Sequence, residues 1–134
     1  MVRLSTSHWI CCLICLTPLL VQAQSPVDPL TGTWRGDWGP TPTHRNAVTL
    51  VLKWDGKTLT GTVNPGSKPI KLKKTSFDPK TGTVHLEADV EQMGKGVYLG
   101  KWAHYVIEGI VQEGTLIGDW NHDNQKGDFK LLKK

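Results

Sequence analysis

The chain has very little cysteine, and all of it lies at one end. Its 134 residues include three cysteines, which are Cys11, Cys12 and Cys15. The rest of the chain therefore has no thiol with which to form a disulfide, a cysteine-ligated zinc site or a cysteine nucleophile. A domain built from that part depends on a hydrophobic core for its stability.

The cysteines belong to a segment with the features of a secretory signal peptide. Arg3 gives the N-terminus a positive charge, an apolar run follows over residues 9–21, and Ala23 ends a site that suits signal peptidase. The run is too short to span a membrane, and the isoleucine before Cys15 does not suit lipidation. We therefore expect cleavage after Ala23, a secreted or periplasmic location, and no stable membrane insertion.

Clustered positive charge is also absent. The 16 basic residues exceed the 12 acidic ones, but most lysines are scattered along the chain. A nucleic-acid-binding protein typically carries a basic stripe with aromatic residues between the charges. We therefore expect no nucleic-acid partner, and no motif in the sequence calls for a cofactor.

Helical periodicity is missing as well, and a strand pattern takes its place. No stretch keeps a helical period for three turns, whereas apolar and polar residues alternate between glycines and turn residues, which predicts an all-β fold. We expect a signal peptide (1–23), an extended segment (24–30) and one domain (31–134). Its eight predicted strands lie near 31–38, 46–54, 57–64, 68–75, 83–91, 101–112, 115–122 and 128–133. With short connections, they predict an antiparallel up-and-down barrel, which would leave no exposed edge.

The first register prediction rests on Asp55-Gly56, a pair typical of a two-residue hairpin turn. Such a turn would place Leu52 opposite Leu59 on one face of the sheet. It would place Thr49 opposite Thr62 on the other face. The turn thus sorts apolar from polar residues, which specifies the inward face.

The second register prediction rests on Glu113-Gly114. A two-residue turn there would place Ile107 opposite Trp120 on the inward face. Glu108 would lie opposite Asp119 on the outward face, where like charges repel each other.

The two ends of the predicted barrel differ in their connections. One end, here called the floor, holds the tight turns at 55–56, 78–82 and 113–114. The opposite end, called the mouth, holds longer connections at 39–45, 65–67, 92–100 and 123–127. Because binding sites are usually built from loops, we expect a site at the mouth.

The segment Leu30-Thr31-Gly32-Thr33-Trp34 resembles the Gly-x-Trp opening of the calycin superfamily, which includes lipocalins, avidins and small secreted bacterial protease inhibitors. The segments 59–63 and 115–120 are also similar to uncharacterised exported proteins of soil bacteria. The resemblance implies a calycin-like barrel with Trp34 packed inside near the floor. It does not imply biotin binding, because Gly36 follows where a polar side chain would be needed and no equivalent serine, asparagine and tyrosine set is visible. The disulfide of many lipocalins and of those inhibitors is absent too.

Aromatic residues are the strongest candidates for a site. By the alternation of inward and outward positions, Trp38, Tyr105, Trp120 and His122 should gather inside the mouth, where they would hold a partly apolar or aromatic small molecule. The alternative is that these rings merely fill the barrel, as Trp34 should at the floor.

Glycines at inward positions favour a cavity over a filled interior. The four inward glycines are Gly36, Gly61, Gly109 and Gly118. Glycine also permits the sharp coiling of a small barrel, so both explanations stay open.

A polar cluster gives weaker support to catalysis. His122 would act as a general acid or base, oriented by Asp123 or Tyr105. Aspartate and asparagine are also ordinary turn formers, and no activated nucleophile accompanies the histidine. A metal site from His44, His122 and Asp123 lacks any fixed spacing.

The sequence therefore favours a small-molecule-binding barrel over two alternatives. The first is a protein that acts through surface loops, like a protease inhibitor or an adhesin, which would expose Pro26, Val27, Pro29 and Leu30. The second is a cofactor-free barrel enzyme that uses His122.

Overall fold

The structure is a computed structural model that describes residues 28–92 and 101–134. These residues form nine strands: β1 (Gly32–Thr41), β2 (His44–Trp54), β3 (Leu59–Val63), β4 (Ile70–Lys71), β5 (Lys74–Asp78), β6 (Thr83–Glu91), β7 (Trp102–Gln112), β8 (Thr115–His122) and β9 (Gln125–Lys133). The all-β prediction is confirmed. The predicted signal peptide (1–23) and residues 24–27 of the extended segment lie outside the described residues.

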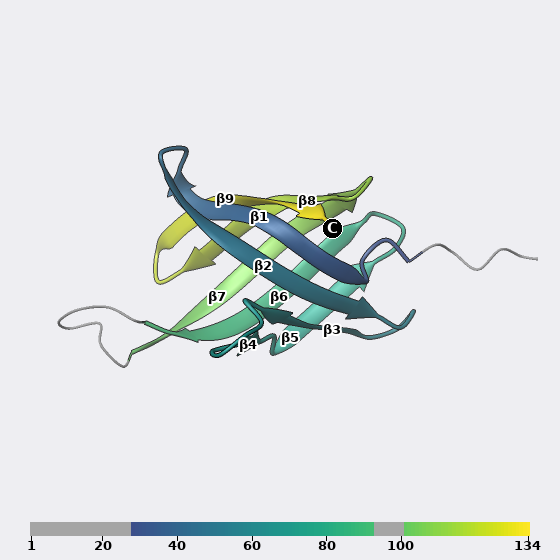
Figure 1. The fold of residues 1–134 in the computed structure, drawn as a ribbon, viewed down its shortest axis with the longest axis horizontal. Coiled ribbons are helices and arrows are strands. Elements are labelled where there is room, and N and C mark those ends of the chain that lie inside the picture. Colours follow the sequence, from purple (N-terminus) through teal and green to yellow (C-terminus); the bar gives the residue numbers. More distant parts are fainter. Residues whose placement is uncertain (1–27, 93–100) are drawn as a thin grey trace, which may run out of the picture.

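All nine strands belong to one antiparallel sheet (Figure 1), in the order β4-β3-β2-β1-β9-β8-β7-β6-β5. The first and last strands of the chain are neighbours, with Trp34 opposite Lys133 and Gly39 opposite Asp128. The sheet curves strongly, but β4 and β5 are its two edges and do not pair with each other. The hydrogen-bonded ladder is therefore not closed into a barrel.

The prediction of a single strand at 68–75 is wrong, because the ladder is broken within this segment. That segment contains β4 and the start of β5, which lie at opposite edges of the sheet. Between them, Leu72 donates its backbone N–H to the Gly61 carbonyl of β3 at 3.2 Å, and Lys73 donates to the Glu87 carbonyl of β6 at 2.8 Å. Because adjacent residues bond to different strands, no single strand continues across this segment.

The predicted register of the first hairpin is wrong by two residues. Leu59 lies opposite Trp54 rather than opposite Leu52. The cause is the Asp55 carboxylate, which accepts backbone hydrogen bonds of 2.8 and 2.6 Å from the second and third residues after it. These bonds stabilise a four-residue loop. Since the shift is an even number, every side chain keeps its predicted face.

The predicted register of the second hairpin is confirmed. Ile107 lies opposite Trp120, as the turn at 113–114 implies. Glu113 and Gly114 have φ angles of 50° and 74°, the left-handed conformation at both central positions that a two-residue hairpin turn with the twist of the strands requires.

Two predicted long connections at the mouth are instead tight turns. β1 passes to β2 through residues 42–43, and β8 passes to β9 through Asp123 and Asn124, whose φ angles are 44° and 64°. Asparagine and aspartate tolerate this left-handed conformation, so β9 begins earlier than predicted. β1 and β2 also extend farther than predicted, up to Thr41 and from His44. In Figure 1 both hairpins project at the end opposite to the 113–114 turn.

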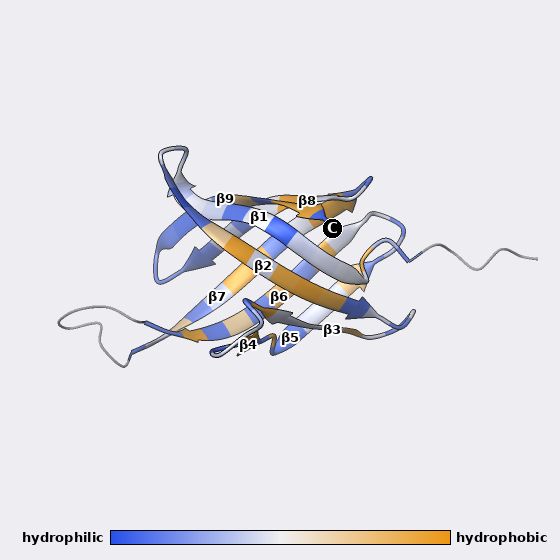
Figure 2. Ribbon diagram, viewed as in Figure 1, coloured by the Kyte–Doolittle hydropathy of each residue, from blue (hydrophilic) through white to orange (hydrophobic). Residues whose placement is uncertain are grey.

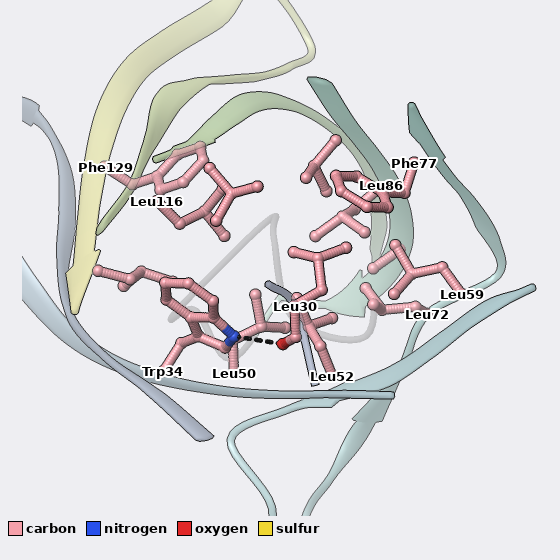
Figure 3. Close-up of a cluster of buried hydrophobic side chains, with 14 of the residues drawn as sticks. Leu30, Trp34, Leu50, Leu52, Leu59, Leu72, Phe77, Leu86, Leu116 and Phe129 are labelled. Atoms are coloured by element: carbon pink, nitrogen blue, oxygen red, sulfur yellow. Dashed lines mark hydrogen bonds between the residues drawn. The ribbon is translucent and has the colours of Figure 1, made fainter. Parts of the chain in front are cut away.

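The floor is closed by a solid cluster of side chains (Figure 3), with Trp34 and Leu30 fully buried in it. Trp34 donates its indole N–H to the Leu30 carbonyl at 2.9 Å. The Asp28 carboxylate holds the chain there by accepting from the backbone N–H groups of Leu30 and Thr31 at 2.9 and 3.0 Å. Leu30 is therefore not available for the surface contact that the inhibitor-like alternative requires, although Pro29 is exposed.

Hydropathy differs between parts of the sheet. The middle of β2 is apolar, whereas the turn that joins β8 and β9 is hydrophilic (Figure 2). Among residues 28–92 and 101–134, we find no helix with the length and apolar character needed to cross a membrane.

Candidate ligand-binding site

The interior is solid at the floor but hollow towards the mouth. A cavity of about 210 Å³ lies among inward side chains from every strand except β5. Four rings line it, those of Trp38, Tyr105, Trp120 and Phe129. The rest of the lining is aliphatic except for one amide side chain, and it includes Leu50, Leu86, Ala88, Ile107 and Leu131.

The structure brings the four predicted site residues together. Trp38 meets Trp120 edge to face, with ring centroids 5.0 Å apart, and Tyr105 lies 6.0 and 5.9 Å from these two rings. His122 packs against Tyr105 at 4.2 Å and Trp120 at 5.7 Å. Edge-to-face and offset contacts at these separations stabilise aromatic clusters beyond the area they bury. The rings of Trp38, Tyr105 and Trp120 line the cavity, whereas His122 contacts the last two from outside the lining.

Strand alternation explains how the rings meet. On β8 every second residue from Leu116 points inward, so Trp120 and His122 share one face. Trp120 is fixed further by its indole N–H, which donates to the Asp128 carbonyl of β9 at 3.2 Å. On β1 the pairing stays regular up to Trp38, and a bulge follows it.

His122 is held by packing and by one acidic neighbour. Its side chain is 9% exposed, and its Nδ1 lies 3.3 Å from the Asp123 carboxylate. Because it does not line the cavity, the imidazole is placed to support the Tyr105 and Trp120 rings rather than to contact a bound molecule.

Tyr105 supplies a polar group beside the cavity. Burial raises the pKa of its phenol, which the Gln92 side chain partly offsets by a hydrogen bond. The hydroxyl therefore stays protonated at neutral pH and can donate as well as accept.

Asn64 is a lining residue that the sequence analysis missed. It follows β3 with a φ of 48°, and its side-chain oxygen accepts from the Thr49 backbone N–H at 3.1 Å, while its own N–H donates to the Thr49 carbonyl at 2.7 Å. Asparagine often adopts this conformation in loops, which was the signal available in the sequence. Its amide therefore adds a polar group to the lining of the cavity.

The inward glycines do not create the cavity, and none of them lines it. A Cβ on Gly36 would lie 1.9 Å from the Lys130 carbonyl oxygen, and one on Gly118 would lie 1.9 Å from that of Glu108. These positions therefore require glycine because neighbouring backbones approach closely, as in a sharply coiled sheet.

The catalytic and metal-binding alternatives gain no support from the geometry. His44 is exposed at the start of β2, and Arg45 points to the outer face, where it pairs with Asp37 at 2.7 Å and with Asp128. In the part of the chain that the structure describes, no three histidine, cysteine or acidic side chains are grouped to hold a metal ion.

Comparison with known proteins gives no match. No family model, curated protein or solved structure matches the chain.

Proposed function

We propose that this protein binds a small, neutral, aromatic or otherwise apolar molecule in the cavity between the floor and the mouth. The observation that carries the proposal is a cavity of about 210 Å³ with an almost wholly carbon lining inside a sheet whose floor is solid. Ligand sites are typically apolar cavities with a few polar groups that orient the ligand.

The size of the cavity sets the size of the ligand. An engineered apolar cavity of about 150 Å³ holds one benzene molecule, so this cavity of about 210 Å³ accommodates one substituted ring or a comparably small aliphatic molecule. A long acyl chain would not fit within it.

The lining also restricts charge. No lining residue is ionised at neutral pH, so a charged ligand would lose its hydration without gaining a counter-charge, at a cost of several kcal/mol. One neutral polar substituent is acceptable if it reaches the Tyr105 hydroxyl or the Asn64 amide. The rings of Trp38 and Trp120 favour a planar ligand through edge-to-face contact.

Nitrobenzene tests the proposal, because it is a neutral single ring that quenches tryptophan fluorescence. We would use Trp102→Phe as the background, since Trp102 is 67% exposed and would be quenched by collision alone. We expect saturable quenching with a dissociation constant on the order of 0.1–1 mM, as the size of the ligand implies. Benzoate, which carries a charge, should not compete.

Two alanine substitutions make the test specific to the cavity. Ala88 lines the cavity and is buried, whereas Ala47 is exposed on β2. Ala88→Leu fills part of the cavity and should weaken binding at least tenfold, and Ala47→Leu should leave it unchanged. Equal affinities in both variants, or a linear and non-saturable response in the parent protein, would disprove binding in the cavity.

We also infer that the fold is calycin-like and that the protein is exported. Three observations support the first inference: β1 and β9 are adjacent, Trp34 is buried, and the interior is solid at the floor and hollow towards the mouth. Arg3, the apolar run and Ala23 support the second. The intact mass of protein recovered from the cell envelope or the medium should correspond to a chain that begins at residue 24, and a mass that includes residues 1–23 would contradict cleavage.

A further inference from the structure

The break in the ladder lies beside the cavity. We call the place where β4 faces β6 the seam: the two strands are in contact but are not hydrogen-bonded neighbours in the sheet. Ile70 on one side of the seam lines the cavity, as do Ala88 and Val90 on the other. Separating these two strands would widen the access to the cavity, which is already partly open, without breaking a bond of the ladder.

Three bonds among residues 28–92 and 101–134 bear on the seam. The Lys73 backbone N–H donates to the Glu87 carbonyl of β6, and on the floor side the Thr75 hydroxyl donates to the Leu59 carbonyl and joins β5 to β3. On the mouth side, the Lys73 ammonium pairs with the Asp89 carboxylate of β6. This ion pair draws the segment after β4 onto the outer face of β6.

Asp89 is itself part of a row of alternating carboxylates and imidazoles on the outer face of β6 and β7. His104 Nδ1 lies 2.6 Å from Asp89, and His104 Nε2 lies 3.1 Å from Glu87. His85 Nε2 lies 2.9 Å from the other Glu87 oxygen, and His85 Nδ1 contacts Glu108.

This contact pattern favours the protonated form of both imidazoles. A neutral imidazole donates from one nitrogen and presents a lone pair at the other, whereas an imidazolium donates from both. Each of His85 and His104 meets a carboxylate at both nitrogens, so loss of a proton would set a lone pair against a negative charge. The other charged groups that face the row are Lys74, 3.9 Å from Glu87, and Asp119, which lies opposite Glu108.

We propose that the ligand reaches the cavity through the seam, and that the Lys73–Asp89 ion pair, supported by protonated His104 and His85, holds the seam closed. This proposal rests on the proposed binding function and concerns its regulation. It predicts a site that exchanges its ligand slowly in mildly acidic solution and faster in alkaline solution.

The pKa values of the row support this direction. The hydrogen bond to Asp89 raises the pKa of His104, and the bond to Glu108 raises that of His85. Because the pKa of each histidine is raised, the stabilisation that its protonated form gives to the row is complete below about pH 6.5, the ordinary pKa of histidine. That stabilisation is lost as the pH rises through the raised pKa. The hydrogen bonds from Lys73 and His85 lower the pKa of Asp89 and Glu87, respectively, so the carboxylates remain charged well into the acid range.

The test compares ligand exchange in two lysine variants. Lys73→Gln removes the ion pair, whereas Lys71→Gln removes an exposed lysine of β4 and serves as the control. NMR relaxation dispersion of nitrobenzene should give association and dissociation rates that both rise about two- to fivefold in Lys73→Gln, the range expected for an exposed ion pair. The dissociation constant should not change, because access affects both rates equally.

A pH series completes the test. Exchange in the parent protein should accelerate as the pH rises from 6 to 9, and His104→Gln should exchange faster at pH 6 with a weaker pH dependence. Saturable binding with unchanged rates in Lys73→Gln would place the route elsewhere and overturn the seam proposal alone. Absence of saturable nitrobenzene binding in the parent protein would overturn both proposals.

Discussion

The clearest energetic prediction concerns Trp34, the largest fully buried side chain. Its side chain has no exposed surface, and its indole N–H donates to the Leu30 carbonyl. Trp34→Ala removes a ring that fills the space between the strands and leaves that carbonyl without its donor. We expect a large loss of stability and no change in ligand preference, because Trp34 does not line the cavity.

The size of the loss follows from burial. A tryptophan side chain buries about 150–250 Å², which at about 25 cal/mol per Å² corresponds to about 4–6 kcal/mol as an upper value. Measured truncations of large buried aromatics cost about 3–5 kcal/mol, and the lost hydrogen bond adds about 1 kcal/mol. We therefore expect Trp34→Ala to lower the free energy of unfolding by about 4–6 kcal/mol.

Urea unfolding followed by circular dichroism measures this loss, with two comparison variants. Trp34→Phe keeps a ring but loses the indole donor, and it should cost about 1–3 kcal/mol. Trp102→Ala removes a ring that is 67% exposed and should cost less than about 0.5 kcal/mol. A cost below about 1 kcal/mol for Trp34→Ala, or equal costs at positions 34 and 102, would refute the assignment of the floor.

Three further predictions test register, coiling and charge. Thr49→Lys should be tolerated on the outer face, whereas Leu50→Lys, one residue along and buried, should prevent folding. Identical circular dichroism spectra of the two variants would refute the assignment of Leu50 to the inward face. Gly118→Ala should cost about 3 kcal/mol in urea unfolding, because its Cβ would lie 1.9 Å from the Glu108 carbonyl oxygen, and a neutral effect would contradict the close approach. The free energy of unfolding should fall as the pH rises above about 6.5, because the raised pKa of His85 means that the unfolded chain releases its proton first. His85→Gln should weaken the dependence of the free energy of unfolding on pH, measured by urea titrations from pH 5 to 9. An unchanged dependence would contradict a stabilising role for protonated His85 in the row of carboxylates and imidazoles.

Much of the strand layout is predictable because it depends on local chemistry. The turn at Glu113-Gly114 fixes the β7–β8 register, since few other sequences adopt two successive left-handed residues. Alternation along β8 places Trp120 and His122 on one face. These are properties of neighbouring residues, and the sequence contains them directly.

The missed features depend on contacts between distant residues or on competing local bonds. The carboxylate of Asp55 lengthens the first loop by bonding to backbone N–H groups, and this alternative to a two-residue turn has nearly the same sequence signal. The break at Leu72 and Lys73 depends on partners in β3 and β6. The position of Asn64 in the lining depends on the curvature of the whole sheet.

The most direct test of the central claim is an intermolecular NOE measurement between nitrobenzene and the methyl groups of the protein. Binding in the cavity predicts NOEs from the ring protons to the methyls of Ala88, Leu50 and Ile107, which line it. The outer face provides the contrast, because Ile110 and Ile117 are 51% and 50% exposed there. NOEs confined to those two isoleucines would contradict a ligand site inside the sheet.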